Sequence, residues 1–237
     1  MKRLDSPRDV ILLDMGNRLI LASAVDSCGG IGDQKYDALS VDPVIVGNFT
    51  TRVAVLEIMA VGAEPAFVSL AVCSGPLTAG PIIEGVKKAA GEIPLIVSTE
   101  KNMPAPMTGI GVTVTGFCAA DGLLTARAKP GDSLFCAGLP LVGHETLQDG
   151  ARLLNAGHLT VLLQDKRVHS LIPVGSAGVA AEAAVLAAES GLICKLEEAP
   201  GIDLYKSAGP STCAVFAAET GEDFHIDLPV FKIGRLL

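Results

Sequence analysis

The chain has 237 residues, of which 49% are hydrophobic and 19% are charged, and its formal net charge is −8. A chain of this length and composition can bury a sizeable core, which excludes a disordered protein. The acidic balance, the absence of a basic cluster and the lack of tryptophan argue against nucleic acid as a partner, because such partners are bound through Lys, Arg and stacked aromatic rings.

The sequence favours a reduced, cytoplasmic protein with no membrane partner. Its six cysteines lie far apart and form no C-x-x-C pair, which argues against a structural zinc site. No apolar run follows the basic residues of the N-terminal segment MKRLDSPRDV, so we expect no signal peptide. The most apolar long stretch, residues 171–192, contains Glu182 and Glu189 and predicts a buried alanine-rich helix with its lead-in, not a membrane span.

The first half of the chain predicts the order β-β-α-β-α-β-β. Gly16-Asn17 is a turn dipeptide between two apolar runs and predicts a hairpin. Asp42-Pro43 is typical of a helix start, and apolar residues recur at helical spacing until Gly62. The two strands of the hairpin are expected at 9–14 and 18–25. Further strands are expected at 66–73, 93–98 and 109–116, with a second helix at 78–90. This order predicts an α+β, ferredoxin-like unit whose helices cover one face of a mixed sheet, with residues 95–97 in a buried strand.

Turn signals at Asp121-Gly122 and Pro130-Gly131 mark a boundary near residue 120, so we divide the chain into domains at 1–120 and 121–237. The second domain predicts a strand at 133–137, a weakly patterned helix near 143–156, an alanine-rich helix at 177–190 and strands near 192–197 and 212–218.

Four acidic residues interrupt the apolar segments of the first half. Asp9 and Asp26 bracket the hairpin, Glu57 lies at the flank of a helix stripe, and Glu100 ends a strand. Each alone is most simply a solvated side chain. Together they form a pattern that suits Mg²⁺, which takes carboxylate ligands along with waters and substrate phosphates. Lys101 would supply a positive charge for a phosphate.

No P-loop motif is present, and the segment GGIGD at 29–33 lacks the full dinucleotide fingerprint, so a plain loop explains it better.

Several segments, in order, resemble one superfamily. They are ASAVDSCGGIG at 22–32, LEIMAVGAEPAFVSL at 56–70, STEKNMP at 98–104, AKPGDSLFCAG at 128–138 and GSAGVAAEAAVLAAESG at 175–191. In the same order, they resemble five features of that superfamily. These are a strand that ends on Asp, an acidic helix that runs into G-A-x-P, a G-G-E/D-T segment, the start of a second domain, and a helix that begins with Gly. The superfamily is that of aminoimidazole ribonucleotide synthetase (PurM-like), which includes thiamine-monophosphate kinase, selenophosphate synthetase and the hydrogenase maturation ATPase.

This resemblance implies a PurM-like two-domain fold, with a ferredoxin-like N-terminal domain that binds ATP and Mg²⁺ and forms a homodimer, and a reduced α/β C-terminal domain on the acceptor side. The implied metal ligands are Asp9, Asp26, Glu57 and Glu100. The implied nucleotide-binding residues are Asp26, Glu57, Thr99, Glu100, Lys101 and Asn102.

The departures from the family pattern concern the acceptor. Ser98 and Thr99 replace two glycines, and IPVGSAGV at 172–179 replaces an acidic D-x-S-D-G-G segment. The segments VDSCGGIG and STEKNMPAPMTGIGVTVTG resemble a short branch that phosphorylates α-ribazole, so we expect transfer of the γ-phosphoryl of MgATP to a small nucleoside-like acceptor. The candidate catalytic residues are Lys101 and His144, and the candidate acceptor-binding residues are Gly143, His144, Gly175, Ser176, Ala177 and Gly178.

Simpler explanations stay open at this point. The small residues at 175–178 could simply pack a helix against a sheet, and His144 could be a surface histidine. The chain could be a nucleotide-binding protein that has lost catalysis, or a thiamine-monophosphate kinase-like or amidine-forming synthetase. The lack of a cysteine in an N-terminal reactive loop counts against selenium chemistry.

Overall fold

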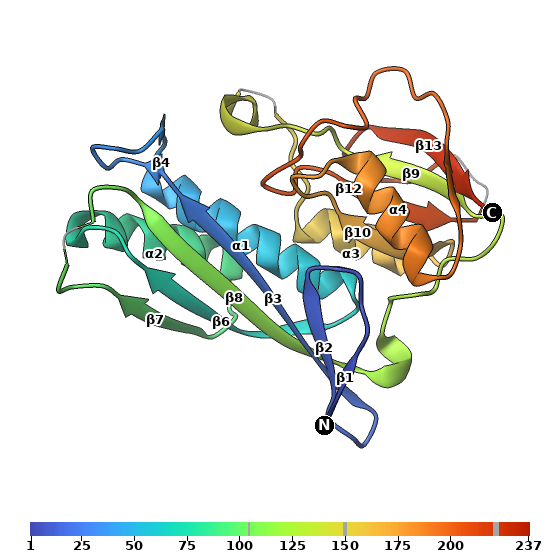
Figure 1. Ribbon diagram of the computed structural model, residues 1–237, viewed down its shortest axis with the longest axis horizontal. Coiled ribbons are helices and arrows are strands. Elements are labelled where there is room, and N and C mark those ends of the chain that lie inside the picture. The colour runs from blue at the N-terminus through green and yellow to red at the C-terminus, as the bar shows by residue number, and fades with distance from the viewer. Residues whose placement is uncertain (104, 149–150, 220–222) are drawn as a thin grey trace. The chain divides into compact units, whose positions relative to one another are not determined.

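The computed structural model describes residues 1–103, 105–148, 151–219 and 223–237, and the chain forms two compact units (Figure 1). The first unit comprises Met1–Leu4, Asp9–Ile58 and Ala63–Asp121. The second comprises Asp5–Arg8, Met59–Gly62 and Gly122–Leu237, so two short early segments belong to it.

A six-stranded sheet forms the first unit, in the order β1-β2-β3-β8-β6-β7. Its strands are β1 (Lys2–Leu4), β2 (Val10–Asp14), β3 (Leu19–Gly29), β6 (Glu64–Val72), β7 (Leu95–Thr99) and β8 (Gly109–Ala119). Only β6 and β7 pair in parallel. The short strands β4 (Ile31–Gly32) and β5 (Leu39–Ser40) form a separate parallel pair. The predicted α+β class is confirmed, and the predicted elements occur in the predicted order, with β1, β4 and β5 as strands that were not expected.

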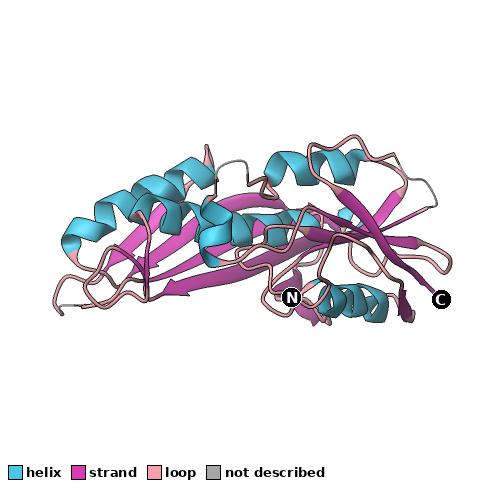
Figure 2. Ribbon diagram, turned by 90° about the horizontal axis from the view of Figure 1, so that it is seen from above, coloured by secondary structure: helices cyan, strands magenta, loops and turns pink. Residues whose placement is uncertain are grey.

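The helices α1 (Pro43–Ala60) and α2 (Pro76–Ala90) both lie on one face of this sheet (Figure 2). They pack closely on each other, because a Cβ added at Gly47 would meet the carbonyl oxygen of Ile82 and one at Gly85 would meet that of Val44. Glycine is therefore required at this crossing. By length and mean hydropathy α1 could span a membrane, but 56% of it is buried inside the protein, as in a core helix.

The expectation that residues 95–97 form a buried strand is wrong. β7 is the last strand of the sheet, and Ile96 is 66% exposed and Val97 37% exposed. A short apolar run does not reveal whether its strand lies at the centre or at the edge of a sheet.

The second unit contains a five-stranded antiparallel sheet in the order β10-β12-β9-β13-β11. Its strands are β9 (Ser133–Ala137), β10 (Val168–Pro173), β11 (Cys194–Leu196), β12 (Ala214–Ala218) and β13 (Val230–Leu236). The helix α4 (Val179–Glu189) packs against Leu134 and Cys136 on one face. Phe135, on the opposite side of β9, stacks on Phe216. Because both faces are covered, every residue of β9 and β12 is buried.

Two expectations for the second unit need correction. The helix expected at 143–156 is instead a short 3₁₀ helix, η2 (Gly143–Leu147), followed later by α3 (Ala156–Gln164). Asn155 caps α3 by accepting a hydrogen bond from the backbone N–H of His158, which is the start signal that the weak pattern concealed. The strands β10 and β13 were not expected at all. A 3₁₀ helix, η1 (Ala120–Gly122), lies at the division between the units.

A buried ion pair joins distant segments of the second unit. The Arg8 guanidinium donates to both carboxylate oxygens of Glu189, at 2.8 and 2.5 Å, and both side chains are almost fully buried. It also donates to the carbonyl oxygens of Leu171 and Ala60 and to the hydroxyl of Ser170. This network attaches the segment Asp5–Arg8 and the end of α1 to β10 and α4.

Candidate functional site

Asp26 lies near the carboxyl end of β3, on the face that α1 and α2 cover. It shares this face with Ala22 and Ala24, which are buried. Across the sheet it pairs with Val112 of β8. The sequence therefore places a carboxylate where the strand alternation calls for a core residue.

Burial raises the pKa of the Asp26 carboxyl to about 6, against a smaller lowering by the backbone N–H of Ser27. No ion pair to Asp26 forms within the part of the chain that the structure describes. The neighbouring Cys28 thiol has its pKa raised to about 11, first by burial and then by the negative charges of Asp26 and Asp37. A half-buried carboxylate without a countercharge is costly, which makes Asp26 a candidate cation ligand.

A loop beside Asp26 is held by a network of polar side chains. Asp37 accepts hydrogen bonds from the backbone N–H and the hydroxyl of Thr108, both at 2.7 Å, and from the backbone N–H of Gln34 at 2.8 Å. Burial acts to raise the pKa of Asp37, but these bonds together outweigh it and lower that pKa. Asp33 accepts from the hydroxyl of Thr78 of α2. Sequence reasoning missed this network, and its one signal was the segment GGIGD, which was explained as a plain loop.

The carboxyl end of β7 carries the predicted residues Thr99, Glu100, Lys101 and Asn102. Glu100 is exposed, and its Oε1 accepts from the backbone N–H groups of Asn102 and Met103 at 2.5 and 3.2 Å. The bond from Asn102 is the main reason that the pKa of Glu100 is lowered. Lys101 and Asn102 are exposed and Thr99 is half-buried. Glu100 thus caps its own turn, and Pro104 lies outside the described residues.

Asp26 and Glu100 cannot hold the same ion. Two strands, β8 and β6, separate β3 from β7, so three strand spacings put about 14 Å between them. Magnesium ligands lie at about 2.0–2.1 Å from the ion. Among the described residues, no three His, Cys, Asp or Glu side chains gather closely enough to hold a metal.

Asp9 and Glu57 lie on elements next to Asp26. Asp9 directly precedes Val10, which pairs with Ala24 of β3, and its side chain is exposed. Glu57 is half-buried on α1, one residue before Ile58, whose side chain reaches Gly116 of β8. Asp9 therefore lies level with Val25, next to Asp26, whereas the contact of Ile58 with Gly116 puts the end of α1 level with Ala22, four residues along β3 from Asp26.

The magnesium that the resemblance implies fits Asp26. Mg²⁺ is usually bound through one or two carboxylates, with waters and phosphate oxygens as its other ligands. A single desolvated carboxylate without an ion-pair partner meets this requirement.

The predicted acceptor residues lie in two segments of the second unit. Gly143 has a positive φ of 54° and His144 is exposed on η2. Ser176 and Ala177 are exposed in the turn before α4, where Gly178 has a φ of 87°.

The segment 205–208 connects these two parts. Lys206 donates to Glu145, the residue after His144, at 2.7 Å. The backbone of residues 205–206 lies against Gly178, and Ala208 donates its N–H to the carbonyl oxygen of Gly175 at 3.1 Å. The structure therefore brings the predicted acceptor segments to one short stretch of chain.

No protein-family model matches the sequence, and no curated protein sequence matches it either. Solved structures do match. AaThiL in complex with AMPPCP and TMP has a TM-score of 0.69 and 17% identity, covering 96% of this chain and 84% of that one. Thiamine-monophosphate kinase from Stenotrophomonas maltophilia has a TM-score of 0.66 and 19% identity, with 99% and 88% covered. HypE in the HypE–HypF complex has a TM-score of 0.66 and 19% identity, with 97% and 87% covered.

These likenesses establish the fold. The chain has the α+β, PurM-like architecture of those proteins over nearly its whole length.

Proposed function

We propose that this chain is an ATP-dependent small-molecule kinase, which transfers the γ-phosphoryl of MgATP to a nucleoside-like acceptor, namely α-ribazole. The observation that carries the proposal is Asp26, a desolvated carboxylate without a countercharge at a strand end of the first unit. A likeness to AaThiL, solved with the nucleotide analogue AMPPCP, supports it. The enzyme would act in the cytoplasm.

The first unit would hold the nucleotide. Asp26, with the predicted ligands Asp9 and Glu57, would bind Mg²⁺, which supplies charge neutralisation at the phosphates. Lys101 is exposed at the end of β7 and would offer a cation to a phosphate group, with Thr99, Glu100 and Asn102 around it. Phosphoryl transfer depends mainly on positioning and charge, so no covalent nucleophile is required.

The second unit would bind the acceptor. The small residues Gly175, Ser176 and Ala177 would let a flat base approach the backbone, next to Gly178, which packs against residues 205–206. His144, exposed beside Gly143, would take the proton of the attacking hydroxyl. The neutral turn at 175–178 suits an uncharged nucleoside better than the cationic ring of a thiamine phosphate.

A nucleotide-binding protein without catalysis is the second candidate, and Ser98 and Thr99 in place of two glycines favour it. A thiamine-monophosphate kinase-like enzyme and an amidine-forming synthetase share the same fold and complete the set of candidate functions.

An assay of phosphate transfer from labelled ATP in the presence of Mg²⁺ distinguishes these functions. It is run with α-ribazole, with thiamine phosphate and without any acceptor. We expect labelled product only with α-ribazole, because its base is neutral. Turnover of thiamine phosphate alone would reject the choice of acceptor. ADP that forms equally without any acceptor, or no ADP under any condition, would reject the kinase.

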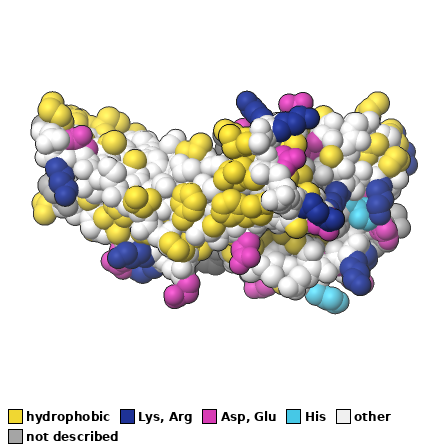
Figure 3. Space-filling view, turned by 90° about the horizontal axis from the view of Figure 1, so that it is seen from below, with side chains coloured by type: hydrophobic (Ala, Val, Ile, Leu, Met, Phe, Trp, Pro, Cys, Tyr) yellow, Lys and Arg dark blue, Asp and Glu magenta, His cyan; other side chains and the backbone are white. Residues whose placement is uncertain are grey.

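We also propose a homodimer formed through the first unit. The face of its sheet opposite the helices exposes hydrophobic side chains, and Figure 3 shows that hydrophobic side chains reach the surface on the side of the molecule that it draws. Those exposed on the sheet face are Ile11, Leu19, Val25, Phe67 and Ile96. An exposed apolar sheet face of this kind is usually covered by a partner.

The substitution Val25→Lys is expected to turn the dimer into a monomer, because it puts a charge in the middle of this face, where Val25 is 66% exposed. Sedimentation at micromolar concentration measures the change. Leu77→Lys is the matched control, since Leu77 is 93% exposed but lies on α2. A wild-type protein that sediments only as a monomer would contradict the proposal.

A further inference from the structure

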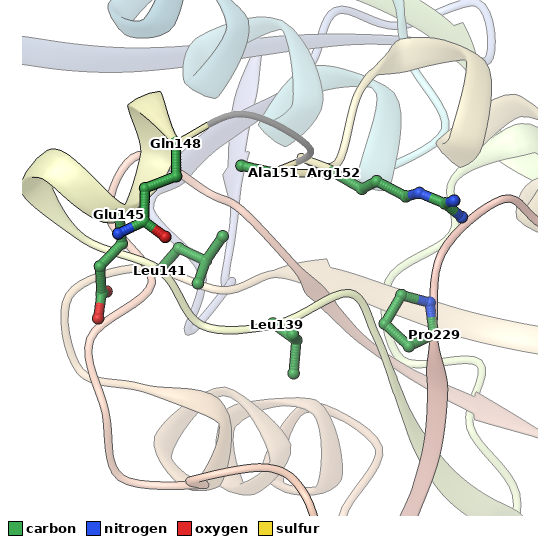
Figure 4. Close-up of a pocket in the computed structure, with 7 residues that line it drawn as sticks. All are labelled: Leu139, Leu141, Glu145, Gln148, Ala151, Arg152 and Pro229. Atoms are coloured by element: carbon green, nitrogen blue, oxygen red, sulfur yellow. The ribbon is translucent and has the colours of Figure 1, made fainter.

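The second unit contains a cavity of about 370 Å³ between the segment that follows β9 and the lead-in to β13. Figure 4 displays its lining. The residues are Leu139, Leu141, Glu145, Gln148, Ala151, Arg152 and Pro229. This volume lies in the range of pockets that hold small organic ligands.

The cavity has an apolar middle and two polar ends. Leu139 and Leu141 lie between Glu145 and Gln148 at one end and Arg152 with Pro229 at the other (Figure 4). A ligand that fills it must therefore have an apolar body, because a fully hydrated ion would leave the leucines in contact with water.

The charge at the Arg152 end can be exchanged. Arg152 donates to Asp227 at 2.6 Å, but the two side chains are 62% and 81% exposed. Ion pairs this exposed contribute little to stability, so an incoming anion can replace the Asp227 carboxylate at low cost. A guanidinium can also donate two parallel hydrogen bonds to a phosphate or carboxylate.

The charge at the opposite end is already compensated. Both oxygens of Glu145 lie 2.7 Å from Lys206 Nζ, and Glu145 also accepts from the backbone N–H of Val142 at 2.9 Å. The Lys206 bond is the main reason that the pKa of Glu145 is lowered. Glu145 therefore stays an ion paired with Lys206 and does not repel a ligand anion, and the exposed Gln148 amide adds a donor and an acceptor.

We propose that this cavity is a binding site for a small organic anion, in which an apolar ring lies over Leu139 and Leu141 and the anionic group replaces Asp227 on Arg152. The site belongs to the second unit alone and does not depend on phosphoryl transfer by the chain.

A ligand-observed NMR titration with three matched probes tests the proposal. Phenyl phosphate has a ring and an anion, inorganic phosphate has only the anion, and benzyl alcohol has only the ring. We expect phenyl phosphate to bind with a Kd of about 1 mM or below, which is within the affinity that a ligand with so few atoms can reach. Each of the other two probes should bind at least about tenfold more weakly.

Variants separate this site from general surface binding. Arg152→Ala should weaken phenyl phosphate binding roughly tenfold, because a charge-assisted pair is lost. Asp227→Ala should strengthen it several-fold, because the guanidinium no longer has a competitor. Ala151→Trp should abolish binding by filling the cavity, whereas Arg235→Ala, another exposed arginine, should leave it unchanged.

Melting curves of the four variants identify any that fail to fold. Equal affinities for the three probes would overturn the proposal. Weaker binding by Asp227→Ala would do so as well, because a purely structural Arg152–Asp227 pair predicts that outcome.

Discussion

The substitution Asp26→Asn is expected to weaken binding of AMPPCP in Mg²⁺ by about 100-fold, since even residues that only support metal ligands cost about 10–100-fold when replaced. The same change should stabilise the metal-free protein by about 1 kcal/mol, because it removes a desolvated charge that solvent screens only in part. Opposite effects on binding and stability are the signature of a group held for a ligand. Calorimetry and thermal melting measure the two effects.

The gain in stability should depend on pH. The Asp26 pKa is raised from 3.8 to about 6 in the folded protein, so the folded state keeps its proton where the unfolded state has released it. The free energy of unfolding therefore falls as pH rises from about 4 to 6. The difference between Asp26→Asn and wild type should be absent below this window and complete above it.

Asp5→Asn, at an exposed carboxylate, is the control for these melting curves. Parallel curves for wild type and Asp26→Asn over the whole range would contradict a raised pKa at Asp26. Unchanged AMPPCP affinity in Asp26→Asn would remove Asp26 from the nucleotide site.

Arg8→Ala is expected to lower the free energy of unfolding of the second unit by about 3–5 kcal/mol, as is typical when one partner of a buried ion pair is removed. The change leaves Glu189 buried without a countercharge and takes donors from Ser170 and the Leu171 carbonyl. Urea denaturation followed by circular dichroism measures the loss.

Arg18→Ala is the matched control. Its ion pair with Asp121 is 73% and 70% exposed, so the expected loss is below about 0.5 kcal/mol. The double variant Arg8→Met/Glu189→Leu should recover most of the stability, because a buried pair can be replaced by apolar side chains of similar size. A loss for Arg8→Ala as small as that for Arg18→Ala would contradict the account of this network.

Local chemistry explains which elements the sequence could predict. Gly16 and Asn17 both have positive φ in the hairpin turn, and α1 begins at Pro43, as its start signal indicated. The strand β10, VHSLIP, is hidden in the sequence because it runs directly into the Gly-led turn of α4, so that residues 171–173 fall in the apolar stretch that predicts this helix and its lead-in. The strand β13, VFKIGRL, is interrupted by Lys232, Gly234 and Arg235, which weakens its alternation.

The candidate site was predictable only in part. Asp26 stands out because it breaks the alternation of its strand, and that signal is local. The distance between Asp26 and Glu100 follows from the strand order, which places β8 and β6 between them. The contacts of Asp37 with Thr108 and of Arg8 with Glu189 join residues 71 and 181 positions apart, and no spacing rule within one segment predicts such pairs.

Calorimetric titration of the wild-type chain with AMPPCP, in excess Mg²⁺ and then in EDTA, tests the central claim most directly. The account predicts saturable binding in Mg²⁺ and about 100-fold weaker binding in EDTA, because the triphosphate would then meet the Asp26 carboxylate without a cation between them. Equal affinity in the two buffers, or no binding in either, would contradict it.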